Sequence, residues 1–377
     1  MDGEKSDYAR CREEAVVRKL SRSYDLAGLS SGSSRLTAPA PESNEVPSAP
    51  LVLLDIATEE GVTGRSYLFA YTPVTLRSLV RLINDLEPEL VGKPVVPFDR
   101  MRQLEMRFRL VGWQGLIGMA VGAIDMALWD ALGLAAKLPL VSLIGGDVRP
   151  LQAYDSYGII DPKKDSGLLE RSVQSGFTAI KIKIGAGTLD NDINIVSETR
   201  RIIGPKVKLM VDYNQSQTVP SAIERILRLS EFDLAWVEEP VLADDLHGHR
   251  RVRTAVTPVP VQTGENWWFP RGMANSIAAN ASDLAMVDIM KIGGVTGWLN
   301  AMGQAEAASL PLSSHTFNEP SAHVLAVTPT AHWLEFLDIA GALLTERLLP
   351  QNGTVTPRGP GLGMTWDEEA VARHLWT

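Results

Sequence analysis

The amino-acid sequence predicts an α/β fold in which a barrel of repeating strand–helix units follows a smaller α+β domain. Seven apolar segments each end in isolated charged or polar residues, and successive ends lie 29, 26, 27, 23, 27 and 20 residues apart from Lys183 onward. This spacing leaves room for one strand, one helix and two short loops, the repeat of a (β/α) barrel. Buried parallel strands are apolar, so charges at their C-terminal ends indicate a function, and a barrel brings those ends to one mouth. The marked residues are Lys181, Lys183, Asp212, Asn214, Glu238, Glu265, Asp288, His315 and Glu335.

Changes in composition predict the domain organisation. Residues 1–49 are atypical, with a short amphipathic helix expected over residues 7–20 and a Gly-, Ser- and Pro-rich loop or disordered stretch after it. Residues 50–145 predict the α+β domain: a hairpin over residues 50–71, then helices over residues 76–90, 98–108 and 116–138, with Asp99 as the N-cap of the second. The barrel is expected over residues 146–340, beginning with the strand RPLQAYDSYG. Residues 341–377 should return across its mouth to the first domain.

Bulk composition excludes several classes of protein. The 377 residues carry a formal net charge of −9, which argues against binding to nucleic acid or to an anionic membrane. The single Cys11 excludes an intrachain disulfide framework and a cysteine metal site. The sequence shows no signal-peptide pattern, and Asp125 and Asp130 interrupt its most apolar helix, so no membrane span is expected. We therefore expect a cytoplasmic protein.

Three carboxylates at successive strand ends predict a metal site. Asp212, Glu238 and Glu265 form a hard oxygen ligand set, without cysteine or paired histidine, that suits Mg²⁺. Without a cation they would repel one another, and their pKa values would rise. The alternative is that each carboxylate pairs with a lysine or arginine at its strand end.

Two lysines on one strand predict a base beside that ion. Lys181 and Lys183 are two residues apart and share one face, while Ile180, Ile182 and Ile184 face the helices. Two adjacent ammonium groups near a cation depress each other's pKa and leave one able to act as a base. The alternative is a solvated strand end with two ordinary lysines.

A second base is predicted on the other side of the barrel. Asp288 and His315 end neighbouring strands, and a carboxylate within reach of an imidazole fixes its tautomer and raises its basicity. His315 alone is equally compatible with a structural role. Glu335 lies in an apolar segment, where burial favours the protonated form. The other histidines have weaker signals: His323 and His332 are expected to pack or cap in a helical run, and His247 and His249 to lie in a loop.

Together these residues describe abstraction of the α-proton of a carboxylate. A metal and a lysine would hold the substrate carboxylate, a protonated Glu335 would share the developing charge, and Lys183 and His315 would act as two opposed bases. Each pKa unit of mismatch between the carbon acid and its base costs about 1.4 kcal/mol, so the enediolate needs fixed positive charge.

The segments KIKIG, VDYNQS, WVEEP, GENW, MVDIMKIGGVTGW, SSHTF and AHWLEFLDIAG resemble the enolase superfamily, specifically its mandelate racemase group. The resemblance runs from about Pro50 to the C-terminus, with all seven segments in order. It implies a modified TIM barrel of the (β/α)7β type with an N-terminal α+β capping domain, which the C-terminal tail completes. It also implies Mg²⁺, a small carboxylate substrate, and a homo-oligomer of up to eight chains.

The resemblance further implies a role for each residue. Asp212, Glu238 and Glu265 would bind Mg²⁺, Lys183 would take the α-proton of an S-configured 2-hydroxy acid, and His315, paired with Asp288, would take it from the R face. Glu335 would be the electrophilic acid and Lys181 the partner of the substrate carboxylate. The implied substrate-binding residues are Asn214 at the α-hydroxyl, Ser156 at the carboxylate, Tyr71 and Phe69 at the side chain, and Tyr157 and Thr316.

Departures from the family pattern leave alternatives open. Residues 1–49 do not match the antiparallel strand and mobile loop with which the family normally begins, Tyr157 stands where the namesake racemase carries a histidine, and Thr316 replaces an apolar residue. We expect a racemase of a 2-hydroxy acid. The alternatives are an acid-sugar dehydratase using the same bases, a cycloisomerase, which would need lysines where Asp288 and His315 occur, and an inactive metal-binding barrel.

Overall fold

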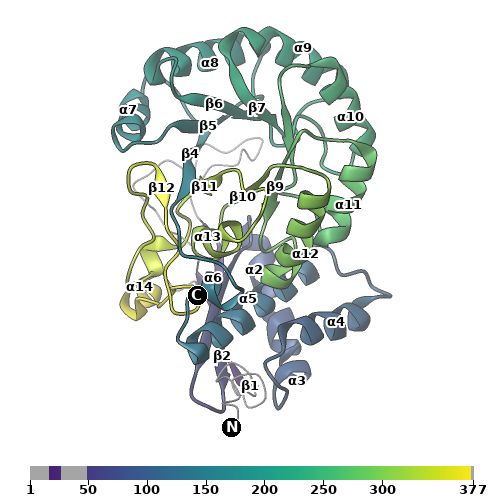
Figure 1. Cartoon of the computed structure of the whole chain (residues 1–377), viewed down its shortest axis with the longest axis vertical. Coiled ribbons are helices and arrows are strands. Elements are labelled where there is room, and N and C mark those ends of the chain that lie inside the picture. Colours follow the sequence, from purple (N-terminus) through teal and green to yellow (C-terminus); the bar gives the residue numbers. More distant parts are fainter. Residues whose placement is uncertain (1–16, 27–48, 375–377) are drawn as a thin grey trace, which may run out of the picture.

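The computed structural model describes residues 17–26 and 49–374 and shows a cap beside a barrel (Figure 1). The cap contains a three-stranded antiparallel sheet in the order β1-β2-β3. A turn joins β2 to β3, as the hairpin prediction required. The cap elements are β1 Val17–Leu26, β2 Leu51–Thr58, β3 Thr63–Phe69, α2 Pro73–Asp85, α3 Glu87–Leu90, α4 Pro97–Phe108, α5 Leu116–Ala136 and α6 Leu140–Leu143.

The N-terminal segment differs from its prediction. Val17–Leu26 is a strand that pairs antiparallel with β2, so the helix expected to continue to Leu20 is wrong there, and the family's first antiparallel strand is present. A strand depends on an available sheet edge more than on local sequence pattern, and β2 supplies that edge. The expected loop over residues 27–48 and the remainder of the expected helix lie outside the described residues.

The barrel has the predicted (β/α)7β architecture. Eight parallel strands run in the order β4 to β11, and backbone hydrogen bonds such as Ser314 N to Trp333 O at 3.0 Å close the ring between β10 and β11. The strands are β4 Leu151–Ile159, β5 Ala179–Lys183, β6 Lys208–Asp212, β7 Leu234–Glu238, β8 Val261–Thr263, β9 Leu284–Asp288, β10 Leu312–His315 and β11 Leu334–Phe336. The helices are α7 Ser166–Gln174, α8 Leu189–Ile203, α9 Val219–Leu229, α10 Leu246–Ala255, α11 Phe269–Ala279, α12 Gly294–Ala307 and α13 Asn318–Ala326.

Two apolar layers position the barrel mouth. Ile180, Ile182 and Ile184 pack in the layer between strands and helices, as predicted from the alternation of β5. Inside the barrel, Tyr154 and Trp236 pack edge to face at 5.5 Å below the charged residues. The polar groups at the mouth therefore rest on a filled interior.

Helix α5 joins the cap to the barrel. It is long and apolar enough to cross a membrane despite its two aspartates, but 89% of its most apolar window is buried inside the protein, as in the core helix of a globular protein. Asp125 accepts hydrogen bonds from Thr296 of α12, and Asp130 accepts them from Arg65 N at 2.7 Å and Leu362 N at 2.6 Å. The two aspartates thus fasten the cap to the barrel and to the C-terminal segment.

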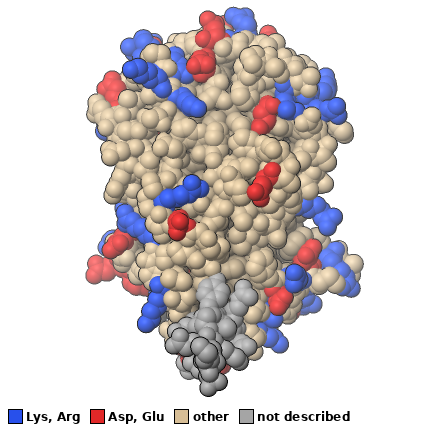
Figure 2. All heavy atoms as spheres, in the orientation of Figure 1, with Lys and Arg blue, Asp and Glu red and all other residues tan. Residues whose placement is uncertain are grey.

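The C-terminal segment returns to the cap, as predicted. It contains η2 Gly341–Leu343, β12 Thr354–Val355 and α14 Glu368–Arg373, and lies beside both barrel and cap (Figure 1). Strand β12 pairs with β4, while Trp366 Nε1 donates to Asp55 Oδ1 of β2 at 2.8 Å. On the face shown in Figure 2, basic and acidic side chains are interspersed, in keeping with the mixed charge of the sequence.

Several local predictions are corrected. Asp99 lies in the first turn of α4, whose N-cap is Val96, and His247 and His249 lie in α10 instead of a loop because Asp245 caps that helix. His323 is buried in α13 and accepts from Val141 N at 3.1 Å, which fits its packing role. His332 lies outside the helix, in the connection to β11.

Candidate active site

The predicted metal ligands converge at the barrel mouth. One carboxylate oxygen each from Asp212, Glu238 and Glu265 lies within 4.8 Å of the others, and all three residues are buried. An octahedral Mg²⁺ with ligands at about 2.1 Å brings such oxygens to about 3–4 Å from one another. The all-oxygen set and its spacing therefore fit a magnesium ion.

Strand register and one glycine place these three carboxylates. Asp212 and Glu238 are paired positions on β6 and β7, so their side chains emerge side by side. Glu265 follows β8 after Gly264, which has a φ of 135°. A Cβ on Gly264 would lie 2.5 Å from the carbonyl oxygen of Met286, so glycine is required there.

The two lysines are bound to this carboxylate cluster. Lys181 Nζ lies 2.6 Å from Glu238 Oε1 and 2.8 Å from Glu335 Oε1. Lys183 Nζ lies 3.2 Å from Asp212 Oδ2 and donates to Asn214 Oδ1. Burial lowers the pKa of Lys183, but the neighbouring carboxylates, Asp212 foremost, raise it above its usual range, so the expected depression by Lys181 does not prevail. A divalent cation bound by the carboxylates would offset the negative charge that keeps the amine of Lys183 protonated.

His315 and Asp288 form the predicted pair. Their strands β10 and β9 are adjacent, and His315 Nδ1 lies 2.7 Å from Asp288 Oδ2. His315 Nε2 faces Glu265 Oε2 at 3.2 Å. Burial lowers the pKa of His315, but Glu265, Glu335 and Asp288 raise it above its usual range. Strands β10 and β5 are separated by β11 and β4 on one side and four strands on the other, so His315 and Lys183 face each other across the mouth.

Glu335 is buried, but its partners favour the ionised form, which argues against the protonation expected from burial alone. Its Oε1 accepts from Ser156 Oγ at 2.7 Å and pairs with Lys181, while its Oε2 accepts from Thr316 N at 2.9 Å. Burial raises the pKa of Glu335, but the charges of Lys181 and His315 and these hydrogen bonds lower it to about 2. Direct cationic partners thus outweigh desolvation at this position.

Most of the predicted substrate-binding residues contact charged groups of the mouth, Phe69 lies beside one of them, and one residue points elsewhere. Asn214 donates to Asp212 through its backbone N–H at 2.7 Å, and the aromatic rings of Phe69 and Tyr71 lie 4.6 Å apart at the end of β3. Thr316 is buried, and its hydroxyl is directed at the pair formed by His315 and Asp288.

Tyr157 is the exception, and its predicted substrate role is wrong. Its hydroxyl donates to Asp155 Oδ2 at 2.9 Å and bonds Ser172 of α7. Alternation along β4 directs Ser156 into the mouth and Asp155 and Tyr157 toward the helices. Tyr157 therefore cannot make the pocket more polar.

Three further residues extend the site, although no role was predicted for them. Asn266 Nδ2 donates to Glu239 Oε2 at 2.8 Å and to Glu265 Oε1 at 3.1 Å, and Lys291 Nζ donates to Asn266 Oδ1 at 2.6 Å. The signal in the sequence was their position: Glu239 and Asn266 each follow a metal ligand by one residue, and Lys291 follows Asp288 by three.

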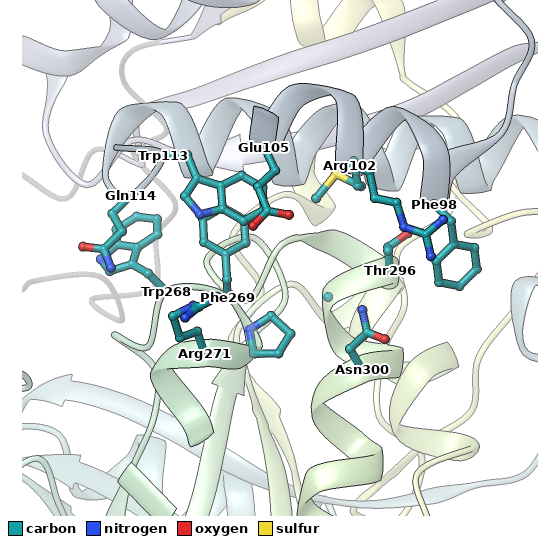
Figure 3. A pocket seen from close by; sticks show the side chains of 13 residues that line it. Phe98, Arg102, Glu105, Trp113, Gln114, Trp268, Phe269, Arg271, Thr296 and Asn300 are labelled. Atoms are coloured by element: carbon teal, nitrogen blue, oxygen red, sulfur yellow. The ribbon is translucent and has the colours of Figure 1, made fainter. Parts of the chain in front are cut away.

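A separate cavity of about 360 Å³ lies between α4 of the cap and helices α11 and α12 of the barrel (Figure 3). Trp113 and Phe269 stack in its wall with ring centroids 3.6 Å apart, and Arg271 and Arg102 line it as well. None of the predicted catalytic or metal-binding residues lines this cavity.

Comparison with known proteins identifies the family. Residues 38–145 match the mandelate racemase / muconate lactonizing enzyme N-terminal domain, and residues 166–370 match the enolase C-terminal domain-like family. The chain belongs to the enolase superfamily, within its mandelate racemase / muconate lactonizing enzyme group. It is thus an enzyme of the magnesium-dependent class that abstracts the α-proton of a small carboxylate.

The relatives have different activities. The chain is 32% identical to a 3,6-anhydro-α-L-galactonate cycloisomerase from Streptomyces coelicolor, over 86% of this chain and 91% of that one. It is 33% identical to an L-talarate/galactarate dehydratase from Salmonella typhimurium, over 87% of this chain and 82% of that one. Among solved structures, an enolase from Bradyrhizobium complexed with magnesium and mandelic acid is 50% identical to this chain, with a TM-score of 0.91. The match covers 97% of this chain and 99% of that one.

Proposed function

We propose that this enzyme racemises a 2-hydroxy carboxylate, mandelate or a close analogue. The observation that carries the proposal is the placement of Lys183 and His315 on facing strands, on either side of the carboxylate cluster. Racemisation needs one group to remove the α-proton from one face and another to return a proton to the opposite face. The mandelic acid bound to the 50% identical relative supports this substrate class.

Each side chain has a defined task in the proposed reaction. Magnesium at the three carboxylates would supply positive charge to the substrate carboxylate and raise the acidity of its α-proton. Lys181 orients that carboxylate, and Asn214 contacts the α-hydroxyl. Lys183 Nζ takes the proton from the S enantiomer, and His315 Nε2 donates one to the other face, with the reverse assignment for the R enantiomer.

Glu335 has a modified role in this scheme. Its ionised carboxylate already lies 2.8 Å from Lys181 and 3.9 Å from His315 Nε2. Substrate binding brings a second carboxylate to Lys181, which weakens the hold of that lysine on Glu335 and favours uptake of a proton. Glu335 would then donate a hydrogen bond to the enediolate oxygen as negative charge develops there.

An acid-sugar dehydratase is the second candidate. The 33% identical relative is an L-talarate/galactarate dehydratase, and the same bases could form the enediolate before a β-hydroxyl leaves. The Thr316 hydroxyl at the pair of His315 and Asp288 supports this alternative, whereas Tyr157, which lies outside the mouth, gives it no support.

Deuterium exchange distinguishes the two candidates. Each enantiomer of mandelate, incubated with enzyme and Mg²⁺ in D₂O, should gain deuterium at C2 and lose optical rotation. Aldonic and aldaric acids should give no 2-keto product. If mandelate and aliphatic 2-hydroxy acids return without deuterium while an acid sugar yields a 2-keto acid, the dehydratase replaces the racemase.

We also propose that the enzyme acts in the cytoplasm as a homo-oligomer of up to eight chains. The family resemblance supports this assembly, and light scattering after gel filtration tests it. A monomer at micromolar concentration would contradict it.

A further inference from the structure

Lys291 is a buried cation that the proposed reaction does not use. Its side chain lies at the C-terminal end of β9, and the residue is only 5% exposed. Among the residues that the structure describes, no carboxylate oxygen comes within 4.0 Å of its ammonium group. Its nearest partners are the amide oxygen of Asn266 at 2.6 Å and the ring of Tyr71, whose centroid lies 4.5 Å away. A desolvated charge without a direct counter-ion is costly, so its position needs an explanation.

The amide of Asn266 passes the influence of this cation to the metal ligands. An amide has one oxygen that accepts and one nitrogen that donates, so Lys291 at the oxygen fixes which end faces the carboxylates. The nitrogen then donates to Glu239 Oε2 and to Glu265 Oε1. Glu265 Oε2 receives no hydrogen bond from Asn266 and pairs with His315 Nε2 at 3.2 Å, so of the two oxygens it is the one that the amide leaves to the ion.

Glu239 depends on the same contact. Its Oε1 is buried and without a hydrogen-bond partner among the described residues, so its bond from Asn266 holds this carboxylate. Glu239 also has a φ of 36°, a left-handed conformation unfavourable for a glutamate, directly after the metal ligand Glu238. The contact from Asn266 therefore steadies a strained segment that carries one metal ligand, as well as Glu265 itself.

We propose that Lys291 is a positioning residue of the metal centre. Through Asn266 it selects the oxygen of Glu265 that binds the ion and holds Glu239 beside Glu238. Through its ring contact it holds Tyr71 of the cap over the barrel mouth. Because Lys291 N also donates to Asp288 Oδ1 at 3.0 Å, one residue connects the ion site, the His315 base and the cap.

Metal affinity tests this inference directly. Lys291→Met keeps the length of the side chain and removes the charge, and the dissociation constant for Mn²⁺ is measured by electron paramagnetic resonance in the absence of substrate. Loss of a group that orients a metal ligand typically weakens metal binding by about 10–100-fold, and we expect a loss in this range. Lys291→Arg should recover part of it. The readout needs no substrate, so it can fail independently of the proposed racemisation.

A matched control and a double mutant separate positioning from general stability. Lys208 also lies over an aromatic ring, Trp333 at 5.7 Å, but at the opposite end of β6 from Asp212, so Lys208→Met should leave Mn²⁺ affinity unchanged. Asn266→Ala should weaken Mn²⁺ binding as Lys291→Met does, and the double mutant no further, because both interrupt one connection. Folding of each variant is checked by its thermal unfolding midpoint.

Two results would overturn the proposal. One is a folded Lys291→Met enzyme that binds Mn²⁺ within twofold of the wild-type constant. The other is a double mutant whose loss equals the product of the single losses, since independent effects would multiply. Should Lys291→Met fail to fold, Asn266→Ala alone tests the proposal. Mn²⁺ affinity equal to that of the wild type in this variant would contradict the proposed role of Asn266 between Lys291 and the metal ligands.

Discussion

The pair formed by His315 and Asp288 provides the sharpest test of the two-base reaction. The backbone N–H of Lys291 donates to Asp288 Oδ1 at 3.0 Å. In Asp288→Asn this donor favours the orientation in which the amide oxygen of the new side chain takes the position of Oδ1. The amide nitrogen then occupies the position of Oδ2, 2.7 Å from His315 Nδ1. An N–H donor at that position forces the imidazole proton onto Nε2, the atom that has to accept the proton of the substrate.

The expected loss can be estimated from the lost contact. A buried hydrogen bond to a charged group contributes about 1.5–3 kcal/mol, which corresponds to about 10–150-fold in rate. The wrong tautomer adds to this, so the range is a lower bound for exchange from the R enantiomer. Lys183 has no contact with Asp288, and exchange from the S enantiomer should change by less than about threefold on this scale.

Proton NMR in D₂O measures both rates on the same preparation. Loss of the C2 proton signal is followed separately for each pure enantiomer, with the Mn²⁺ dissociation constant as the control for an intact metal site. An equal fall in both exchange rates, with unchanged metal affinity, would show that the two faces are not served by two separate bases.

Three other predictions concern the ion and the packing of the cap. Removing the ion with EDTA should abolish α-proton exchange, and Mg²⁺ at 100 times its dissociation constant should stabilise the fold by about 2.7 kcal/mol in thermal unfolding. Burial raises the pKa of Glu319 from 4.5 to about 7, so its contribution to stability is complete below pH 4.5 and is lost as the pH rises to 7. Glu319→Gln, which retains an acceptor for Tyr67, should thus gain up to about 3 kcal/mol at pH 8 and nothing at pH 4, by urea unfolding. A Cβ on Gly122 of α5 would lie 2.2 Å from the carbonyl oxygen of Met290, so Gly122→Ala should cost about 1–3 kcal/mol in urea unfolding. Gly303→Ala in α12, where nothing lies within 4 Å, should cost nothing.

The barrel was predictable because charged residues recur at regular spacing in the sequence and each lies at the end of an apolar segment. Charges such as Asp212, Glu238 and Glu265 are tolerated at the ends of apolar strands only where they share a cation or a counter-charge, and their spacing fixed both the repeat and the shared site. The cap hairpin was predictable from two β-rich runs and a turn. The strand Val17–Leu26 was not predicted, since β1 depends on pairing with β2 and not on a pattern of its own.

Side-chain direction and protonation state were less accessible from the sequence. The family resemblance implies that Tyr157 lies at the mouth, because it stands where the namesake racemase carries a histidine, although alternation along a strand sends Ser156 and Tyr157 to opposite faces. Glu335 was expected to be protonated because its segment is apolar, but its state depends on Lys181, which is 154 positions away in the sequence and 2.8 Å away in space. Such partners are a property of the closed barrel and not of any local pattern.

The charges gathered at the mouth also explain why this site can run the reaction in both directions. Six buried acids face four groups that can be cationic, and in the reacting state one of the two bases is neutral, which leaves three cations and a net charge of −3 before a divalent ion is counted. Moving the α-proton from the substrate to that base leaves the total charge of site and substrate together unchanged, so the step separates charge locally without creating it. Fixed ion pairs and the ion limit the cost of that separation for either base, which is what equal access to two enantiomers requires. The acids are Asp212, Glu238, Glu239, Glu265, Asp288 and Glu335, and the cations are Lys181, Lys183, Lys291 and His315.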